Sequence, residues 1–291
     1  MISILTITYN RGHIIRKTIE SVLSQSYEDF EYVIVDDGSD DITQQVIEEI
    51  ADPRIRYFKL PKIGYLSRLR NYGFKKVKGD FIALVDSDDI WRTTKLQVQM
   101  ESLVSNPELA FSFCDVEIYY YGKLTRSNIY DHSKGEIINK NFFDDYINGR
   151  LTIYSSSTMV FKREVFETIG VQNEDMKSGD HDFICRLLLN YNGCQINKSL
   201  AMIMRHNQNH SRLAGIMPFQ EYIVTLKYLF EKGKITRNTF QRMVSYNYYQ
   251  SGLFYSRSDQ PVSAKLHYLK SFKSYPLRYK ALIRYLMPKI K

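Results

Sequence analysis

Three aspartates follow a short apolar run in the segment "ALVDSDDIW", residues 83–91. Crowded carboxylates such as Asp86, Asp88 and Asp89 repel one another unless a cation, or a ligand that carries one, lies among them. The alternative is a helix N-terminus, because Asp88 or Asp89 could cap a helix that continues through Lys95. Capping accounts for one or two of the acids and not for three, and on this stretch alone both interpretations stay open.

Polar residues also follow two other apolar runs of the chain. "ISILTIT" leads into Thr8, Tyr9 and Asn10, and "EYVIV" leads into Asp36 and Asp37. If these runs are parallel strands, their carboxyl ends meet at one edge of a sheet, where ligands of such sheets bind. Taken alone, "DDGS" at residues 36–39 is also an ordinary polar turn with a helix cap. The coincidence of three polar strand ends favours one shared binding crevice.

The elements that would position these residues alternate between strands and helices over the first hundred residues. Apolar runs at residues 2–8, 31–35, 54–60 and 81–85 have the composition of buried strands. Helical spacing separates them at residues 14–26, around Val46 and Ile50, and at residues 66–77. This alternation predicts an α/β fold, with a doubly wound, mostly parallel sheet and helices on both faces.

The glycine motifs of two common nucleotide-binding classes are missing from the sequence. No G-x-G-x-x-G follows the first strand, which argues against a dinucleotide-dependent oxidoreductase, and no G-x-x-x-x-G-K-[ST] occurs, which argues against a P-loop enzyme. The chain offers carboxylates instead of a glycine cradle. Carboxylates suit a divalent cation that bridges the protein and a diphosphate.

Cysteine content and hydropathy indicate where the protein works. Three cysteines without C-x-x-C spacing, and no signal peptide at the start, favour a reduced, cytoplasmic location. No run approaches the roughly 20 apolar residues of a membrane span, so we do not expect an integral membrane protein.

Charge is distributed unevenly along the chain. From residue 225 onward the chain has 14 lysines and arginines and only two acids, Glu231 and Asp259, so this tail has a net charge of +12. The net charge of the whole chain is +8, so residues 1–224 have a net charge of −4. A nucleic-acid-binding protein spreads basic charge over its working surface, and this segregation argues against a nucleic-acid partner.

The tail itself has helical spacing. Residues 248–276 resemble one tetratricopeptide repeat at Gly252, Tyr255, Ala264, Tyr268 and Pro276, and a single repeat needs another surface to pack on. In residues 277–291, apolar and basic positions alternate as in an amphipathic helix on anionic lipid, with Pro288 shortening it. The basic residues of this helix are Lys280, Arg284, Lys289 and Lys291, and its apolar residues are Leu282, Ile283, Leu286, Met287 and Ile290. A solvated helix face packed on the protein is the alternative.

Four motifs together resemble the family 2 glycosyltransferases, which are inverting enzymes with the GT-A fold. The motifs are "ISILTITYNR", "SVLSQSYEDFEYVIVDDGSDD", "GYLSRLRNYGFKKVKGDFIALVDSDDIW" and "SGDHDFICRLL", and the resemblance extends over about residues 2–215. It implies a catalytic domain at residues 1–215, with a nucleotide-sugar donor half at 1–105 and an acceptor half at 106–215. Residues 216–291 would form a basic helical extension.

By this resemblance, the donor site combines the three strand ends with an arginine-asparagine pair. Tyr9 and Asp37 would hold the nucleotide base, and Arg70 would contact the diphosphate, with Leu69 before it where the family has a small residue. In the D-x-D motif "DSDD", Asp88 would coordinate Mn²⁺ or Mg²⁺, and Asp89 would support the site or cap a helix. The full set of implied donor-binding residues is Thr8, Tyr9, Asn10, Asp37, Arg70, Asn71, Asp86 and Ser87.

The resemblance also implies the acceptor-side chemistry. The family's catalytic base is the aspartate of a Glu-Asp pair, and here the pair reads Gly179-Asp180, which makes Asp180 the candidate base. Its alternative role is a helix N-cap. His206 of "RHNQNHSR" fits the family's metal or phosphate histidine better than His210, and imidazole with carboxylate suits Mn²⁺. A surface histidine without a ligand role is the alternative.

The expected function is inverting transfer of a sugar from a nucleoside diphosphate donor, a UDP-sugar, to a hydroxyl of a growing glycan or lipid-linked saccharide in polysaccharide biosynthesis. The protein would be cytoplasmic, with peripheral attachment to the anionic inner face of the membrane. Two other classes stay open. A sugar nucleotidyltransferase would release pyrophosphate, and a non-catalytic basic module for membrane or nucleic acid would show no metal-dependent turnover.

Overall fold

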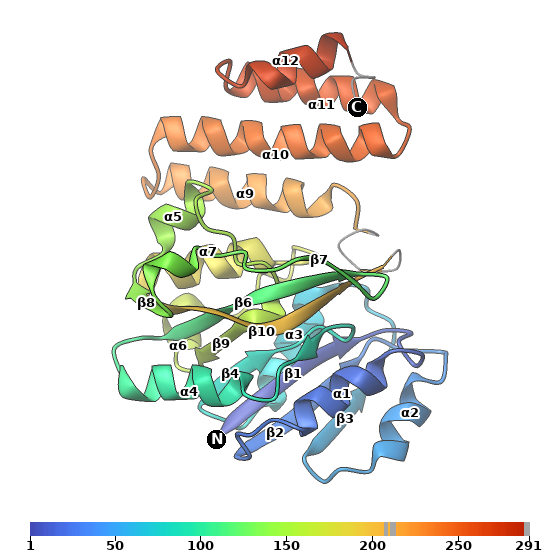
Figure 1. Ribbon diagram of the computed structural model, residues 1–291. Helices are drawn as coiled ribbons and strands as arrows, with labels where there is room; N and C mark the ends of the chain where they lie inside the picture. Colours follow the sequence, from blue (N-terminus) through green and yellow to red (C-terminus); the bar gives the residue numbers. More distant parts are fainter. Residues whose placement is uncertain (207–208, 210–213, 288–291) are drawn as a thin grey trace. The chain divides into compact units, whose positions relative to one another are not determined.

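A ten-stranded mixed sheet organises the first two thirds of the chain (Figure 1). The structure is a computed structural model that describes residues 1–206, 209 and 214–287. The strand order is β3-β2-β1-β4-β9-β6-β10-β5, with β7 paired to β6 and β8 paired to β10. The strands are β1 (Ile2–Thr8), β2 (Phe30–Asp36), β3 (Ile55–Lys59), β4 (Phe81–Leu84), β5 (Ile90–Trp91), β6 (Phe111–Tyr120), β7 (Lys123–Arg126), β8 (Ile137–Lys140), β9 (Met159–Lys162) and β10 (Gly193–Arg205).

The four strands predicted from apolar runs form one parallel block. β1 pairs in parallel with β2 on one side and β4 on the other, and β3 extends the block beyond β2. The predicted helices between them are α1 (Ile15–Leu23), α2 (Thr43–Ile50) and α3 (Leu66–Lys76), and α4 (Lys95–Ser105) follows β5. The α/β class with a mostly parallel core sheet is therefore confirmed.

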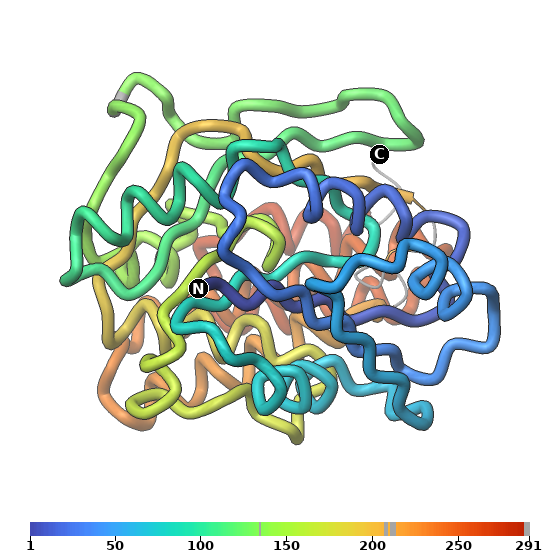
Figure 2. Tube along the Cα trace, turned by 90° about the horizontal axis from the view of Figure 1, so that it is seen from below, coloured from blue at the N-terminus to red at the C-terminus, as the bar shows by residue number. Residues whose placement is uncertain are grey.

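Alternating strand side chains place helices on both faces of this sheet. Ile2 and Ile4 of β1 belong to a core that includes α1, α2 and α4. Leu5 faces the opposite way, against Gly73 of α3, where a Cβ atom would come within 2.5 Å of its methyl group. The phenylalanines of this second face pack on one another: Phe74, Phe161, Phe166 and Phe183. In Figure 2 the tubes of α1 and α3 lie on opposite sides of the strands.

Antiparallel strands complete the sheet in its second half. β9 pairs antiparallel with both β4 and β6, and β5 pairs antiparallel with β10. Helices α6 (Val165–Ile169) and α7 (Asp180–Asn190) lie between β9 and β10 in the chain. The short strands β5, β7 and β8 were not predicted, because strands of two to four residues show no reliable periodicity.

The chain divides into two compact units. One comprises Met1–Phe143 with Thr152–Asn209, and the other comprises Asp144–Leu151 with His210–Lys291. The second unit contains most of α5 (Phe143–Ile147) together with α9 (Met217–Glu231), α10 (Arg237–Arg257), α11 (Pro261–Ser274) and α12 (Tyr279–Leu286). Helices α9 to α12 stack in chain order (Figure 1). The assignment of catalytic and accessory roles to residues 1–215 and 216–291 stays a prediction.

Close packing between α10 and α11 follows the repeat-like spacing of the sequence. A Cβ atom at Gly252 would lie 2.5 Å from the ring of Tyr268, so the ring rests directly on the glycine backbone. Both residues are buried. Within the described part of the chain, no helix has the length and apolar character needed to cross a bilayer.

Candidate active site

The carboxyl ends of β1, β2 and β4 lie at one edge of the sheet. Thr8 pairs with Asp36 at the end of β1 and β2, and the last residue of β4, Leu84, pairs with Leu5 of β1. Asp86, Asp88 and Asp89 follow β4 directly. Parallel pairing therefore brings the three polar segments to the same side of the sheet, as the sequence predicted.

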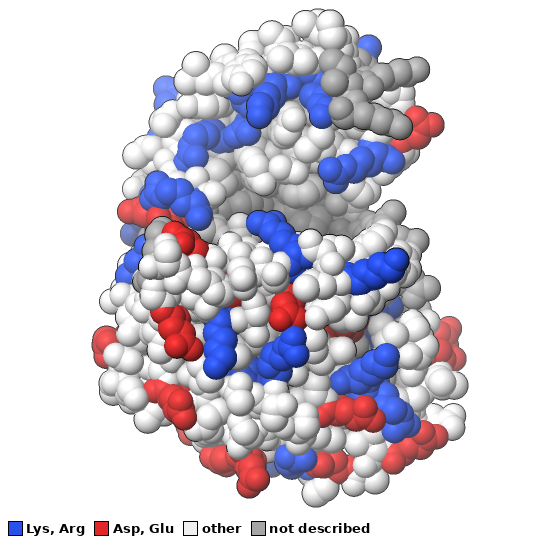
Figure 3. All heavy atoms as spheres, viewed as in Figure 1, with Lys and Arg blue, Asp and Glu red and all other residues white. Residues whose placement is uncertain are grey.

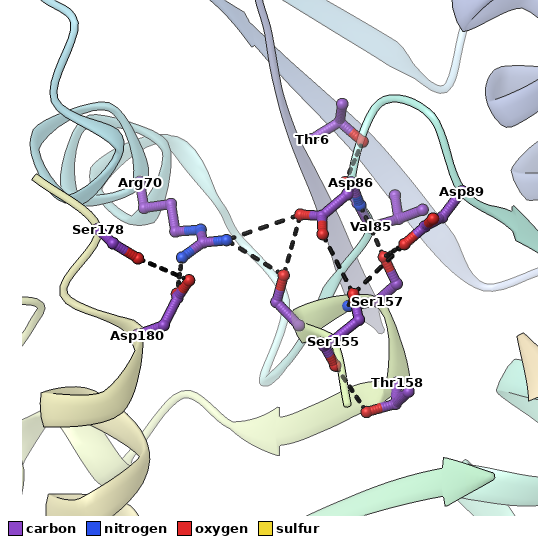
Figure 4. Close-up of polar contacts among 11 residues, drawn as sticks. Thr6, Arg70, Val85, Asp86, Asp89, Ser155, Ser157, Thr158, Ser178 and Asp180 are labelled. Atoms are coloured by element: carbon purple, nitrogen blue, oxygen red, sulfur yellow. Dashed lines mark hydrogen bonds and ion pairs between the residues drawn. The ribbon is translucent and has the colours of Figure 1, made fainter. Parts of the chain in front are cut away.

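Three consecutive serines hold two of the aspartates after β4. The hydroxyls of Ser155 and Ser156 donate to Asp86 over 3.1 and 3.0 Å, and Ser157 donates to Asp89 over 2.6 Å. Figure 4 shows Ser155 and Ser157 beside the two carboxylates. The backbone N–H of Met204 also donates to Asp89 over 3.1 Å. Neither Asp88 nor Asp89 caps α4, whose N-cap residue is Thr94, so the capping alternative is wrong.

Negative charge accumulates around these acids. Burial raises the pKa of Asp89 well above its ordinary value, and the neighbouring Asp86 and Asp88 raise it further. Partial burial also raises the pKa of Asp86, with the Arg70 guanidinium opposing the shift and Asp88 and Asp180 adding to it. The side chain of Asp86 remains 44% exposed, so water still reaches its carboxylate. A cation or a cationic ligand among these groups would relieve the repulsion.

Asp88 lies beside His206, which follows the end of β10. Its Oδ2 atom is 3.1 Å from His206 Nε2 and accepts a 2.9 Å hydrogen bond from Asn209. Asn209 also donates to the carbonyl of Met204, which fixes this turn next to β10. His210 lies outside the described residues. The structure thus brings together the predicted aspartate and histidine, although 118 residues separate them.

Asp88 and His206 offer a carboxylate oxygen and an imidazole nitrogen 3.1 Å apart. Atoms of these two types at this separation suit two ligands of one divalent cation. Among the described residues, no group of three or more His, Cys, Asp and Glu side chains forms a candidate metal cluster. Mg²⁺ and Mn²⁺ sites of phosphate-binding enzymes commonly use one or two protein ligands and complete their shells with substrate oxygens and water. The residues present therefore fit a cation that is shared with a diphosphate.

Arg70 joins the acid cluster to the start of α7. It lies in α3, its side chain is almost fully buried, and its guanidinium forms an ion pair with Asp180. Its other terminal nitrogen donates to Ser156 over 3.1 Å and lies 3.7 Å from Asp86. Figure 4 shows Arg70 between the two carboxylates. A single buried cation thus contacts both acids across the site.

Asp180 is the first residue of α7 and not its N-cap. The cap is Gly179, which has φ of 70°, a conformation that costs a residue with a side chain about 1 kcal/mol or more. Glycine at this position therefore accounts for the missing glutamate of the predicted Glu-Asp pair. Ser178 donates to the second oxygen of Asp180 over 2.9 Å. Asp182 instead pairs with Arg186, four residues along the same helix, and lies away from Arg70.

The ends of β1 and β2 form a second part of the site. Asp37 accepts hydrogen bonds from the backbone N–H groups of Ile63 and Gly64, over 2.6 and 3.0 Å, and pairs with Lys62 over 2.9 Å. The same Lys62 ammonium lies over the ring of Tyr9, which is exposed. The flat ring of Tyr9 can stack on a nucleobase, and the fixed carboxylate of Asp37 can accept a hydrogen bond from the base.

The remaining predicted residues differ in what they contact. Asn10 has φ of 50° and bonds through its side-chain amide to Asp40, so it shapes the loop after β2. Asn71 donates to the carbonyl of Gln172 over 2.8 Å and to the carboxylate of Glu174 over 2.9 Å. It therefore connects α3 to the loop between α6 and α7. Ser87 is buried between Asp86 and Asp88. The hydroxyl of Thr8 is buried without a hydrogen-bond partner in the described part of the chain.

Sequence reasoning did not assign roles to several of these residues. The sequence did not predict the contacts of Asn209, of Lys62 or of the serines at positions 155–157. The available signal was three hydroxyls in a row before the apolar strand β9. Trp91, the last residue of the segment "ALVDSDDIW", is buried and donates its indole N–H to the carbonyl of Ser157 over 2.8 Å.

The amino-acid sequence is similar to a known protein family and to several named proteins. The family model described as Glycosyl transferase family 2 matches residues 3–170, which is more than half of the chain. The chain is 36% identical over 118 residues to the Escherichia coli protein WfgD, named UDP-Glc:alpha-D-GlcNAc-diphosphoundecaprenol beta-1,3-glucosyltransferase, which covers 40% of this chain and 46% of that protein. It is 36% identical over 115 residues to TuaG of Bacillus subtilis, a putative teichuronic acid biosynthesis glycosyltransferase, covering 39% and 45%. The matches thus span about half the length of these curated relatives.

Solved structures share the fold over nearly the whole chain. Residues 1–349 of TarS from S. aureus, in complex with UDP-GlcNAc, superpose with a TM-score of 0.69 at 17% identity, covering 97% of this chain and 83% of that one. The mannosyltransferase PcManGT from Pyrobaculum calidifontis, in complex with GDP-Man and Mn²⁺, gives 0.60 at 14% identity, covering 99% and 87%. At these identities the likeness supports the fold alone.

Proposed function

The chain belongs to glycosyl transferase family 2 and has the GT-A fold, and we propose on this basis that it transfers a sugar from a nucleoside diphosphate donor to an acceptor hydroxyl with inversion at the anomeric carbon. The observation that supports this most directly is the position of Arg70, which contacts Asp180 and lies 3.7 Å from Asp86. Donor-side and acceptor-side groups are therefore within reach of one side chain.

The donor would bind across the ends of β1, β2 and β4. Tyr9 and Asp37 would hold the base, and Arg70 would contact the diphosphate. Asp86 and Ser87 would lie near the ribose and diphosphate. Because the TarS structure contains UDP-GlcNAc, a UDP-sugar is the donor to test first.

Asp88 and His206 would hold a divalent cation, Mn²⁺ or Mg²⁺, which when bound supplies Lewis-acid stabilisation of the leaving diphosphate. PcManGT, a structural neighbour, contains Mn²⁺. Arg70 would add positive charge on the same leaving group, since its guanidinium is fixed by Asp180 and Ser156 before the donor binds.

Asp180 would act as the general base that takes the proton of the acceptor hydroxyl. Ser178 and Arg70 fix its two oxygens, and general-base help of this kind is worth about 10²–10⁴-fold. One direct displacement then inverts the anomeric carbon, and no covalent sugar–enzyme intermediate is required.

The acceptor we propose is a glycan or lipid-linked saccharide, because the relative WfgD is named for transfer to a sugar on diphosphoundecaprenol. We also propose peripheral attachment of the C-terminal helices to the anionic, cytoplasmic face of the membrane. Exposed apolar residues on α12 support this attachment, whereas Lys289, Ile290 and Lys291 of the predicted amphipathic helix lie outside the described residues.

A panel of nucleotide sugars tests the proposal. Purified protein is melted with each UDP-, GDP- and dTDP-sugar, with and without Mn²⁺, and the stabilising donor is then assayed for the product released. Release of a nucleoside diphosphate is expected. Release of pyrophosphate from a sugar phosphate and a nucleoside triphosphate would instead identify a nucleotidyltransferase. No metal-dependent turnover with any donor would favour a binding module.

A further inference from the structure

A basic hollow lies within the helical unit, apart from the residues of the candidate active site. Its volume is about 310 Å³, and it is lined by one residue of α10, by the segment that joins α11 to α12 and by the start of α12. The lining residues are Arg242, Tyr275, Leu277, Arg278, Tyr279 and Lys280. Three of the six are cationic and none is acidic.

The two arginines of the hollow are held by neutral groups. Arg278 donates to Ser245 Oγ over 3.0 Å and to the carbonyl of Arg242 over 3.3 Å, and Arg242 donates to the carbonyl of Asn148 over 2.9 Å. Within the described ranges, no carboxylate oxygen lies within 4.0 Å of either guanidinium or of the Lys280 ammonium. Burial lowers the pKa of Arg278, and the nearby Arg242 adds to that effect. Among residues 1–206, 209 and 214–287, the cluster therefore has no counter-charge.

Apolar side chains surround this cationic hollow. Leu277 and Tyr279 line it and are 76% and 62% exposed. Further along α12 the exposed positions are again apolar, namely Ile283, Leu286 and Met287. Tyr279, Ile283 and Leu286 are spaced as one helical face, while Ala281 on the other side is buried against the unit. On the face drawn in Figure 3, the charged side chains of this unit are mostly basic.

We propose that the hollow binds the phosphate group of an anionic phospholipid, while the exposed apolar side chains of α12 enter the lipid interface. Arginine forks suit phosphate oxygens, and an amphipathic surface with a basic side and large apolar residues is typical of proteins that lie on membranes. The absence of a counter-charge within the described ranges favours an anion over a neutral ligand. This proposal rests on the membrane attachment proposed above and gives it a defined site.

Vesicle co-sedimentation of the full-length protein tests the site. Binding is measured to phosphatidylglycerol vesicles and to phosphatidylcholine vesicles, for the native chain, for Arg278→Gln/Lys280→Gln, and for the matched pair Lys265→Gln/Lys273→Gln. The matched pair removes the same charge from exposed positions of α11 that do not line the hollow. At about fivefold in affinity per basic residue near the lipid surface, the hollow variant should bind phosphatidylglycerol about 30-fold more weakly. The matched variant should lose less than about threefold.

The single variant Lys280→Gln tests the site even if the double variant misfolds, because Lys280 is exposed and contributes no ion pair within the described chain. It should lose about fivefold in affinity with an unchanged melting temperature. Equal losses in the hollow and matched variants would overturn the site in favour of diffuse charge. Failure of the native chain to bind phosphatidylglycerol, or equal binding to phosphatidylcholine, would overturn it as well.

Two further measurements identify the source of the phosphate group and separate lipid binding from the proposed enzymatic function. Inorganic phosphate that stabilises the native chain without any vesicle binding would indicate a soluble phosphate ligand, and equal affinity for a single-stranded oligonucleotide would indicate general polyanion binding. Either result overturns the lipid proposal. Stabilisation by UDP with Mn²⁺ is measured on the same variants and should not change. If UDP, GDP and dTDP all fail to stabilise every variant while lipid binding follows the prediction, only the proposed enzymatic function is wrong.

Discussion

The buried Lys95 offers a quantitative test of the core beneath the candidate active site. It is the first residue of α4, its side chain is fully buried, and its ammonium donates to Gln99 over 2.6 Å and lies 3.9 Å from the centre of the Trp91 ring. No carboxylate lies within ion-pair distance of it in the described ranges. Burial lowers the pKa of Lys95 from 10.5 to about 8.

The sign of the pH effect follows from this lowered pKa. The unfolded chain, with the ordinary pKa, holds a proton on Lys95 between pH 8 and 10.5, whereas the folded chain progressively releases it. The free energy of unfolding therefore rises with pH across this window. From pH 7 to pH 9.5 the contribution of Lys95 to the free energy of unfolding rises by about 2 kcal/mol.

Lys95→Met removes the titrating group and keeps most of the apolar stem. It also leaves the Gln99 side-chain oxygen without its donor, a cost of about 1–3 kcal/mol that does not depend on pH. Urea unfolding at pH 7, 8.5 and 9.5 should therefore show the native chain gaining about 2 kcal/mol relative to the variant. Lys17→Met, at an exposed position of α1, is the control and should run parallel to the native chain. A constant difference between Lys95→Met and the native chain across this range would refute the reasoning.

Three further predictions concern the site and the helical unit. Asp88→Asn should abolish metal-dependent turnover and weaken donor binding measured by calorimetry, because an amide lacks the charge that holds a divalent cation; unchanged metal-dependent activity would remove Asp88 from the site. Asp180→Asn should lose about 10²–10⁴-fold in kcat, while the neighbouring Asp182→Asn stays active. Because Asp180 also fixes Arg70, donor affinity should fall less than in Asp88→Asn, and an equal fall would place Asp180 in the donor site instead. Gly252→Ala should lower the free energy of unfolding by about 1–3 kcal/mol because its methyl group meets the Tyr268 ring, whereas Lys265→Ala at an exposed helix position should change it little. An unchanged melting temperature in Gly252→Ala would show that α10 and α11 can move apart to admit the methyl group without a loss of stability.

The first half of the fold was predictable because its strands are mostly apolar and alternate with helical patterns. β1, β2 and β4 are largely buried on both faces, and such strands are rich in apolar and β-branched residues, as in ISILTIT, FEYVIVD and FIAL. The three polar strand ends could be placed together for the same reason, since parallel pairing fixes which ends meet. The order of the later strands, with β9 antiparallel between β4 and β6, has no comparable signal because it depends on long connections.

The part of the site that was missed depends on contacts between distant residues. Ser155 and Asp86 are 69 residues apart, and no local pattern relates a serine run to an acidic strand end. The position of Asp180 was predicted from a motif, but its ion pair with Arg70 was not, because the approach of α3 and α7 is a tertiary contact. Gly179 is a related case, since the positive φ that requires glycine is visible only in the folded chain.

The segment Asp144–Leu151 has a consequence for modular exchange among related enzymes. It belongs to the helical unit, where Tyr146 packs near Tyr222 and Asn148 accepts from Arg242, although the chain on both sides of it belongs to the other unit. A gene fusion with a single crossover near residue 210 would therefore combine α9 to α12 with a foreign version of this segment. A chimera that keeps the helical unit intact requires three crossovers, on either side of Asp144–Leu151 and near residue 210, so these helices are not exchanged as a simple C-terminal tail.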